Sequence, residues 1–298
     1  MEAVRLPASR IDRRQVGLIG LLLLLAAVGW LVTDDRMAGM DAGPGTDPGS
    51  VGFYVSAWVV MMAAMMFPSA APMVVAYSRT QKQRRDLGRA RAGPIATALF
   101  VAGYLLSWTV FGLLAYGLFD LVRSLNIDAL SWNRGGRYVA GGVILAAAIY
   151  QLTPAKDICL TKCRGPMAFV LGSWREGYGG ALRMGAEHGG WCVGCCWALM
   201  VALFAVGVMS VGWMLFVSAL IAIEKLLPFK AAANRGVAAL LVVLGLGVAF
   251  WAGQVPGLTL PDSRQARGAM MQMSGGSMKG HPMKGDPMKG KPMKSGPR

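Results

Sequence analysis

The stretch WCVGCCWALMVALFAVGVMSVGWMLFVSALIAIEKLL, residues 191–227, decides the class of fold. Its only charged residues are Glu224 and Lys225, close to its end. A helix needs about 20 apolar residues to cross the hydrocarbon layer of a bilayer, so this run is too long for one comfortable crossing. The segment GVMSVG (207–212) supplies a turn near its middle. The stretch therefore predicts two short membrane spans joined by a tight turn.

Further apolar windows of similar kind surround this stretch in the chain. Hydrophobic residues make up 55% of the sequence and charged residues only 15%, and the charges avoid several long segments. Windows of about 18 or more apolar residues are typical of membrane-crossing helices. They lie near 16–33, 51–77, 95–119, 137–154 and 236–254. Together with the two spans above, they predict an all-α, polytopic transmembrane bundle of seven spans, with six as the alternative, and exclude a single soluble core.

The N-terminal window has the form of an anchor that is kept. The basic segment RIDRRQ precedes it, and no clear small-residue cleavage site follows in the usual place. We therefore predict a signal-anchor helix in 1–33, a polytopic membrane domain in 34–255 and a separate tail in 256–298.

Basic residues alternate with acidic ones from loop to loop, which predicts an orientation. The segment 78–91 holds six basic residues and one acid, and 155–190 is also net basic, whereas 34–50 holds four aspartates and one arginine. Short loops on the cytoplasmic side of a membrane carry an excess of Lys and Arg. We expect a bacterial inner (cytoplasmic) membrane protein with its N-terminus in the cytoplasm, a cysteine-containing cytoplasmic loop at 155–190, and a periplasmic or extracellular C-terminus.

The net charge of +15 needs no nucleic-acid partner under this orientation. The basic loops are the expected topology signal, and the aromatic residues near them lie in apolar spans instead of forming a stacking surface for bases. The expected surroundings of the chain are membrane lipids.

The tail is the only low-complexity segment. It reads MKGHP MKGDP MKGKP MKSGP from residue 278, a period of five with Met, Lys and Pro fixed. Gly and Pro at this density predict a disordered segment. Thioethers and an imidazole suit a soft metal, above all Cu(I); the alternative is a basic tail that binds anionic lipid headgroups. The possible tail ligands are Met278, His281, Met283, Met288 and Met293.

The second apolar window is rich in methionine. It contains WVVMMAAMMFPSAAPM, in which Pro68 and Pro72 each remove a backbone donor and bend the helix. One interpretation is a thioether-lined ion path; the other is that methionine fills irregular gaps between helices. The residues concerned are Met61, Met62, Met65, Met66 and Met73.

Five cysteines and a histidine form the main candidate site. His188, Cys192 and Cys196 are four residues apart and share one helical stripe, with Cys195 beside them. Upstream, Cys159 and Cys163 are also four apart. These residues could supply a closed thiolate and imidazole site for a transition metal, copper first and zinc second.

Three other interpretations stay open. A cysteine in a membrane helix is often only a small apolar residue. CVGC (192–195) also fits the C-x-x-C formula of a thiol oxidoreductase, so a membrane thiol-redox protein is an alternative function. A third is a non-catalytic subunit that supports the assembly of a membrane complex.

The remaining ionisable candidate is Glu224, near the end of an apolar span. It is either an interfacial residue or part of a local ion pair, or else a buried carboxylate that pairs with Arg183 or with the metal site. No Walker motif, dinucleotide fingerprint or G-x-S-x-G elbow occurs in the chain, so we assign no catalytic residue.

Several blocks of the sequence resemble a known family. The blocks are AAMMFPSAAPM, LTPAKDICLTKCRGP, WREGYGGALRMGAEHGGWCVGCCWALM, and GVMSVGWM followed by EKLLP, between about 51 and 230. In this order and spacing they resemble the predicted metal-binding integral membrane proteins called domain of unknown function 2182. The resemblance implies a polytopic membrane fold that binds a metal.

These observations combine into one functional hypothesis. A reduced thiolate site at the cytoplasmic face, a methionine-lined helix and a soft-ligand tail on the other face suggest that the protein binds a soft cation and aids its transfer or delivery. A metal-delivery partner or a membrane-complex partner protein would then receive or supply the metal.

Overall fold

The computed structural model describes residues 13–88, 93–125, 131–261 and 263–278, and its regular structure there is entirely helical. The predicted all-α class is therefore confirmed. In chain order, the elements are α1 (Arg13–Met37), α2 (Val51–Asp86), α3 (Ile95–Ser124), a π-helical turn (Trp132–Gly136), α4 (Arg137–Gln151), α5 (Pro154–Arg164), α6 (Pro166–Gly172), α7 (Gly177–Val206), α8 (Val211–Leu226), α9 (Lys230–Phe250), a 3-10 turn (Ala252–Gln254) and α10 (Arg264–Met278).

Five helices, α1, α2, α3, α7 and α9, are long and apolar enough to cross a membrane. A sixth span results if Trp132–Gln151 and Pro154–Arg164, which are bent by 66°, are taken as one. Helix α8 has 16 residues and is therefore about 24 Å long, less than the ~30 Å of a hydrocarbon core. All seven predicted apolar stretches are largely helical, but the count of sufficiently long spans is five or six, because α4 and α8 are short.

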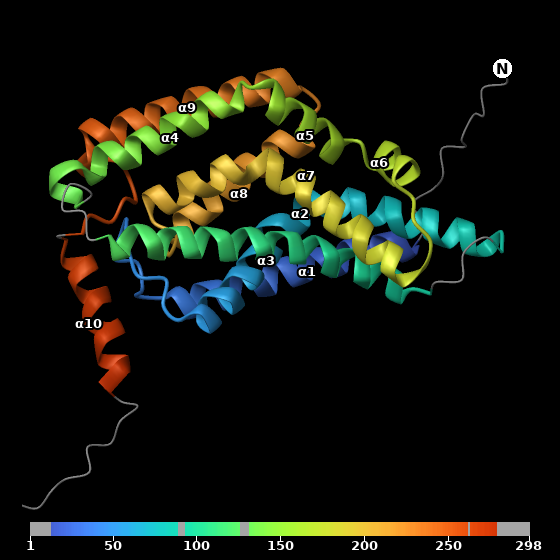
Figure 1. Cartoon of the computed structure of the whole chain (residues 1–298), viewed down its shortest axis with the longest axis horizontal. Helices are drawn as coiled ribbons and strands as arrows, with labels where there is room; N and C mark the ends of the chain where they lie inside the picture. Colours follow the sequence, from blue (N-terminus) through green and yellow to red (C-terminus); the bar gives the residue numbers. More distant parts are fainter. Residues whose placement is uncertain (1–12, 89–92, 126–130, 262, 279–298) are drawn as a thin grey trace, which may run out of the picture.

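Most connections between helices gather at two opposite ends of the bundle, whereas the turns from α4 to α5 and from α8 to α9 lie near its middle (Figure 1). At one end, Asp47 pairs with Arg123 at 2.9 Å, and the segment around Asp41 meets Gly207 and Thr259. At the other end, Arg84 pairs with Glu176 at 2.9 Å. We name these the Asp47 end and the Glu176 end. Apart from those two turns, the connections alternate between the two ends in the order that the charge pattern predicts; which end faces the cytoplasm stays a prediction.

The segment 155–190, predicted to be a loop, is helical. It forms α5, α6 and the first half of α7, which continues without a break from Gly177 to Val206. The continuation is hidden in the sequence because Arg183 and Glu187 interrupt the apolar pattern while lying on the outer side of the helix, where they are exposed or half-buried. The prediction that the cysteines lie at the end of a span, at the cytoplasmic face, is therefore wrong. Cys192 lies near the middle of α7, 15 residues after Gly177 and 14 before Val206.

The first part of the tail, predicted to be disordered, is also helical. Helix α10 covers Arg264–Met278, and the Ser263 side chain accepts a hydrogen bond from the Ala266 backbone at 3.1 Å. Ala266 and Ala269 bury their methyl groups against Ala42. Arg, Gln, Ala and Met are good helix formers, which favours this start. The repeats at 279–298 lie outside the described residues.

Helices α3 and α7 pack closely because glycines remove side chains from their contact. A Cβ built on Gly185 would lie 1.9 Å from the carbonyl oxygen of Phe100, and one on Gly103 would lie 2.0 Å from that of Leu182. Gly189 similarly faces Tyr104 and Ser107. Small residues four apart are how helices approach closely in a bilayer. This packing sets the side of α7 that points into the bundle.

We expect Gly185→Ala to destabilise the protein by about 1–3 kcal/mol or more, the usual cost of overpacking. The new methyl group would clash with the backbone of α3, which has no room to move away. Gly190→Ala is the matched control: a Cβ at Gly190 has nothing within 4 Å and improves helix propensity by up to about 1 kcal/mol. Thermal unfolding of the purified variants in detergent measures both. Equal midpoints for the two variants would contradict this account of the contact.

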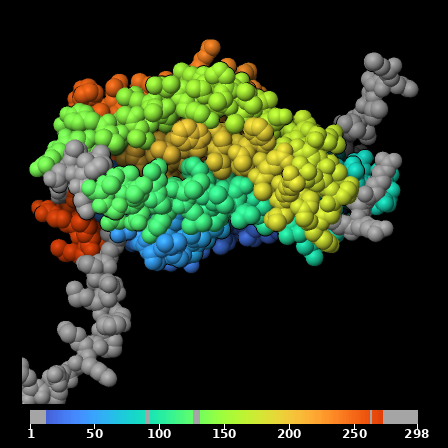
Figure 2. Space-filling model, in the orientation of Figure 1, coloured from blue at the N-terminus to red at the C-terminus, as the bar shows by residue number. Residues whose placement is uncertain are grey.

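Three helices that are shorter than α7 contact it, namely α4, α5 and α8. Helix α8 runs from the Asp47 end and stops near the level of Cys192, where the turn to α9 and helix α5 also lie (Figure 1). In the space-filling view, the bands of α3 and of α4–α5 adjoin α7 on this face (Figure 2). The inward side of α7 at this level is thus enclosed, and Cys192, Cys195 and Cys196 are buried.

Candidate metal centre

Three cysteine sulfurs of α7 lie together in the interior of the bundle. The Sγ atoms of Cys192, Cys195 and Cys196 all lie within 4.8 Å of one another, and the side chains are at most 1% exposed. Residues three and four apart in a helix share a face, so the spacing of these cysteines brings them together directly. A ligand set of this geometry needs only small adjustments to hold one ion.

Helix α5 supplies a fourth sulfur from a distant part of the chain. The Sγ of Cys163 lies 3.7 Å from that of Cys195, which is itself 3.3 Å from the Sγ of Cys196. The Sγ of Cys159 lies farther along α5, against Gly194, where a Cβ would approach it to 2.8 Å. All five cysteines are free thiols. Four of the five predicted cysteines thus come together around Cys195, whereas Cys159 lies one helical turn away on α5.

Ion pairs fasten α5 to the end of α8. Lys156 Nζ and Glu224 Oε1 are 2.6 Å apart, and the two side chains are 0% and 1% exposed. Arg164 donates to the carbonyl oxygens of Glu224 and Leu227, and Lys230 pairs with Asp157 at 2.8 Å. Glu224 is therefore buried and pairs with Lys156, not with Arg183, which is exposed. These contacts position Cys163 beside the α7 cysteines.

Cys192 also has two polar partners. Lys225 Nζ lies 2.9 Å from its Sγ, and the Tyr104 hydroxyl lies 3.1 Å from the same atom. Lys225 additionally reaches Ser69 on α2 at 3.5 Å. A positive charge at this distance offsets the negative charge that thiolates carry when they bind a metal in a low-dielectric interior.

His188 lies on the same stripe of α7 but outside the sulfur group. Its ring packs among Phe100, Tyr104 and Phe169, with centroid distances of 5.4–6.2 Å, and the side chain is 3% exposed. Its Nδ1 is buried and has no hydrogen-bond partner among the described residues. The structure does not place this imidazole with the three clustered thiols.

The methionines of α2 are all buried, at 2% exposure or less. Four of them belong to the same packed core as the cysteines, whereas Met73 belongs to the neighbouring core around Tyr77 and Phe100. The four are Met61, Met62, Met65 and Met66. Burial alone fits gap filling as well as an ion path.

Three residues near the cysteines were not predicted from the sequence. Tyr104, Lys156 and Lys225 contact partners 88, 68 and 33 residues away, so no local spacing connects them. A lysine at the end of an apolar run is the one available hint, because such a charge needs a partner inside the bundle.

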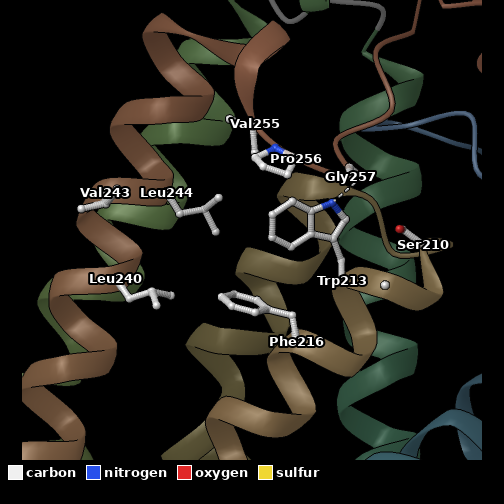
Figure 3. Close-up of a pocket in the computed structure, with 10 residues that line it drawn as sticks. Ser210, Trp213, Phe216, Leu240, Val243, Leu244, Val255, Pro256 and Gly257 are labelled. Carbon is white, nitrogen blue, oxygen red and sulfur yellow. Dashed lines mark hydrogen bonds between the residues drawn. The ribbon is translucent and has the colours of Figure 1, made fainter.

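A wide apolar cavity lies elsewhere, between α8 and α9 (Figure 3). It measures about 610 Å³, and its walls include Trp213, Phe216, Leu240 and Leu244. Trp213 donates from its indole to the Gly257 carbonyl at 3.0 Å at one edge. Neither a cysteine nor a methionine lines this cavity, so it offers no ligand to a soft metal.

The donor set of the sulfur group fits a soft cation. Thiolates select Cu(I), zinc and related ions, whereas hard cations require oxygen ligands. The group consists of cysteines alone in the described part of the chain, and the Glu224 carboxylate pairs with Lys156 instead. Its fourth sulfur comes from another helix, so a small movement of α5 would change the number of ligands.

Comparisons with known proteins agree with this chemistry. The family model PpoB2, described as copper chaperone, matches residues 55–248, which is more than half of the chain and includes all five cysteines. No curated protein and no solved structure matches the sequence. By this match, the chain belongs to the PpoB2 family of copper chaperones.

Proposed function

We propose that the protein is a membrane-embedded chaperone that holds Cu(I) on Cys192, Cys195 and Cys196 and delivers it to a partner protein. The observation that carries the proposal is the group of three buried sulfurs within 4.8 Å on one helix, in a chain of the copper chaperone family. Cys163 joins as a further sulfur from α5.

Copper is favoured over zinc because the donors are sulfur and the surroundings are thioether. Zinc sites in proteins are commonly tetrahedral and often include imidazole, whereas Cu(I) accepts soft thiolate and thioether ligands. His188 lies outside the group, and the core that contains the cysteines also contains Met62, Met66 and Met200. Lys225 balances one of the negative charges that the thiolates carry around a monovalent ion.

The membrane placement is part of the proposal. The long apolar helices and alternating basic loops support a bacterial inner membrane, with the Glu176 end in the cytoplasm and the Asp47 end outside. The tail, with its methionines and His281, would then capture or receive copper on the outer side. Several closely spaced thioether ligands raise the local ligand concentration, so Cu(I) would pass between them.

Titration of the purified protein with Cu(I) against a coloured chelator tests the proposal. We expect one Cu(I) to be bound tightly by the wild type, and none by a variant with serine at all three α7 cysteines. In a zinc competition, Cu(I) should displace zinc from the wild type. Tight copper binding that survives the triple substitution would remove the proposed site.

A mixed-disulfide trap separates this function from the thiol-redox alternative. If CVGC were an oxidoreductase motif, Cys195→Ser would leave Cys192 linked to a partner protein in cells. We expect no such adduct, since Cys192 is buried with its sulfur facing Lys225 and Tyr104. Repeated recovery of the adduct would favour the redox function.

A further inference from the structure

Soft ligands continue along α7 on both sides of the cysteines. Met184, His188, Cys192, Cys196 and Met200 follow one another at intervals of four residues. Each side chain is at most 3% exposed. Residues four apart are neighbours on a helix surface, about 5–6 Å apart at Cβ, so each member of this series adjoins the next. We call the series the α7 ladder.

The ladder extends from the cysteines toward both ends of the bundle. Met184 and His188 lie between the sulfur group and the Glu176 end, and Met184 packs in the core around Tyr77 and Phe100. Met200 lies on the other side, toward the Asp47 end, in the same core as the cysteines. The ladder therefore contains thioether or imidazole on each side of the thiols.

His188 provides an independent indication of a ligand. A buried nitrogen without a hydrogen bond costs free energy and is rare in folded proteins. Among the described residues, Nδ1 of His188 has no hydrogen-bond partner, although Tyr104 and Phe100 pack against its ring. Phenylalanine would fill this aromatic pocket without that cost. The imidazole is thus explained by a ligand better than by packing.

We propose that Met184 and His188 form a second station for Cu(I), and that Met200 forms a third, so that the ion moves along α7 through the cysteine group. This inference rests on the proposed function and adds a route to it. The thiolates bind tightly, whereas a thioether or a neutral imidazole binds weakly and releases its ion quickly. Weak stations on each side of a tight one let an ion leave in small steps, without exposing the thiolates to solvent.

Nuclear magnetic resonance of the imidazole nitrogens tests the second station directly. The chain has two histidines, so ¹⁵N-labelled histidine gives two sets of signals, and His281→Ala in the full chain assigns them. Ag(I) serves as a redox-inert soft cation. We expect the first equivalent to leave His188 largely unchanged and further Ag(I) to shift its signals. The effect should weaken in Met184→Leu, which keeps the volume but removes the sulfur.

Each other outcome of the titration is decisive. If the His188 signals never move while the thiols fill, His188 is not a station and the inference fails. If they move together with the first equivalent, His188 is a ligand of the cysteine site and there is no separate station. If no Ag(I) or Cu(I) binds at all, the proposed function itself fails.

Release kinetics test the route. Cu(I)-loaded protein in nanodiscs is mixed with a hydrophilic Cu(I) chelator, which reaches both faces. We expect His188→Phe and Met200→Leu each to slow release partly, since one exit remains, and the double variant to slow it about tenfold or more. Equilibrium copper content should stay at one ion. Met37→Leu, a buried methionine outside α7, is the control. Wild-type release by the double variant would overturn the route.

Discussion

Cys195→Ser is expected to lower the Cu(I) affinity by about 100-fold or more, the largest loss of any single substitution in the chain. Its sulfur is the centre of the group: it lies 3.7 Å from Cys163 Sγ and 3.3 Å from Cys196 Sγ, and it belongs to the same group as Cys192. A hydroxyl is a hard, neutral donor in place of a soft thiolate. Each factor of ten corresponds to about 1.4 kcal/mol of binding free energy.

Cys159→Ser is the matched control for this prediction. Cys159 lies on the same helix as Cys163 and is half-buried, but its sulfur faces Gly194 instead of the three clustered thiols. We expect its Cu(I) affinity to stay within about tenfold of the wild type. Competition with a chelator of known affinity gives both values. Similar losses for Cys159→Ser and Cys195→Ser would mean that the ion binds between α5 and α7 in another arrangement.

Lys156→Met is expected to destabilise the protein by about 3–5 kcal/mol, because it leaves the Glu224 carboxylate buried without its partner. The pair is 2.6 Å apart and almost fully buried. Replacing both residues, as Lys156→Met with Glu224→Leu, should recover most of this loss, since two apolar side chains can fill the space of a buried ion pair. Copper affinity should fall in the single variant as well, because the pair holds α5 and therefore Cys163 in place.

The control is the exposed pair between Lys230, at the start of α9, and Asp157, which is also on α5. Its side chains are 28% and 57% exposed, and such pairs contribute about 1 kcal/mol or less. Lys230→Met should therefore shift the thermal midpoint only slightly. A Lys156→Met variant as stable as Lys230→Met would show that the buried pair does not hold α5.

Apolar runs and their lengths predicted the helical class and six of the ten α-helices in the described residues. They located α1 to α4, α8 and α9, because a long apolar segment has few alternatives to a helix in a bilayer. They failed for α7, where polar residues on the outer side conceal the continuation through 177–190. The start of α10 was missed because its stability depends on alanine packing against Ala42, a contact distant in the sequence.

The cysteine site was predictable in its ligands but not in its surroundings. A spacing of three and four residues is a local property of a helix, so Cys192, Cys195 and Cys196 could be grouped from the sequence. Lys225 and Tyr104 enter through the packing of α8 and α3 on α7, which no pattern in one sequence specifies. For the same reason, the separation of His188 from the thiols became visible only in the structure.

X-ray absorption spectroscopy of the Cu(I)-loaded protein tests the central claim most directly. The full-length chain should carry leucine in place of all seven tail methionines, at 270, 271, 273, 278, 283, 288 and 293, so that the tail supplies no sulfur. The account predicts one bound copper in the cuprous state, surrounded by about two to three sulfur atoms and no nitrogen or oxygen. A first shell dominated by nitrogen or oxygen, or a protein that takes up no copper, would contradict it.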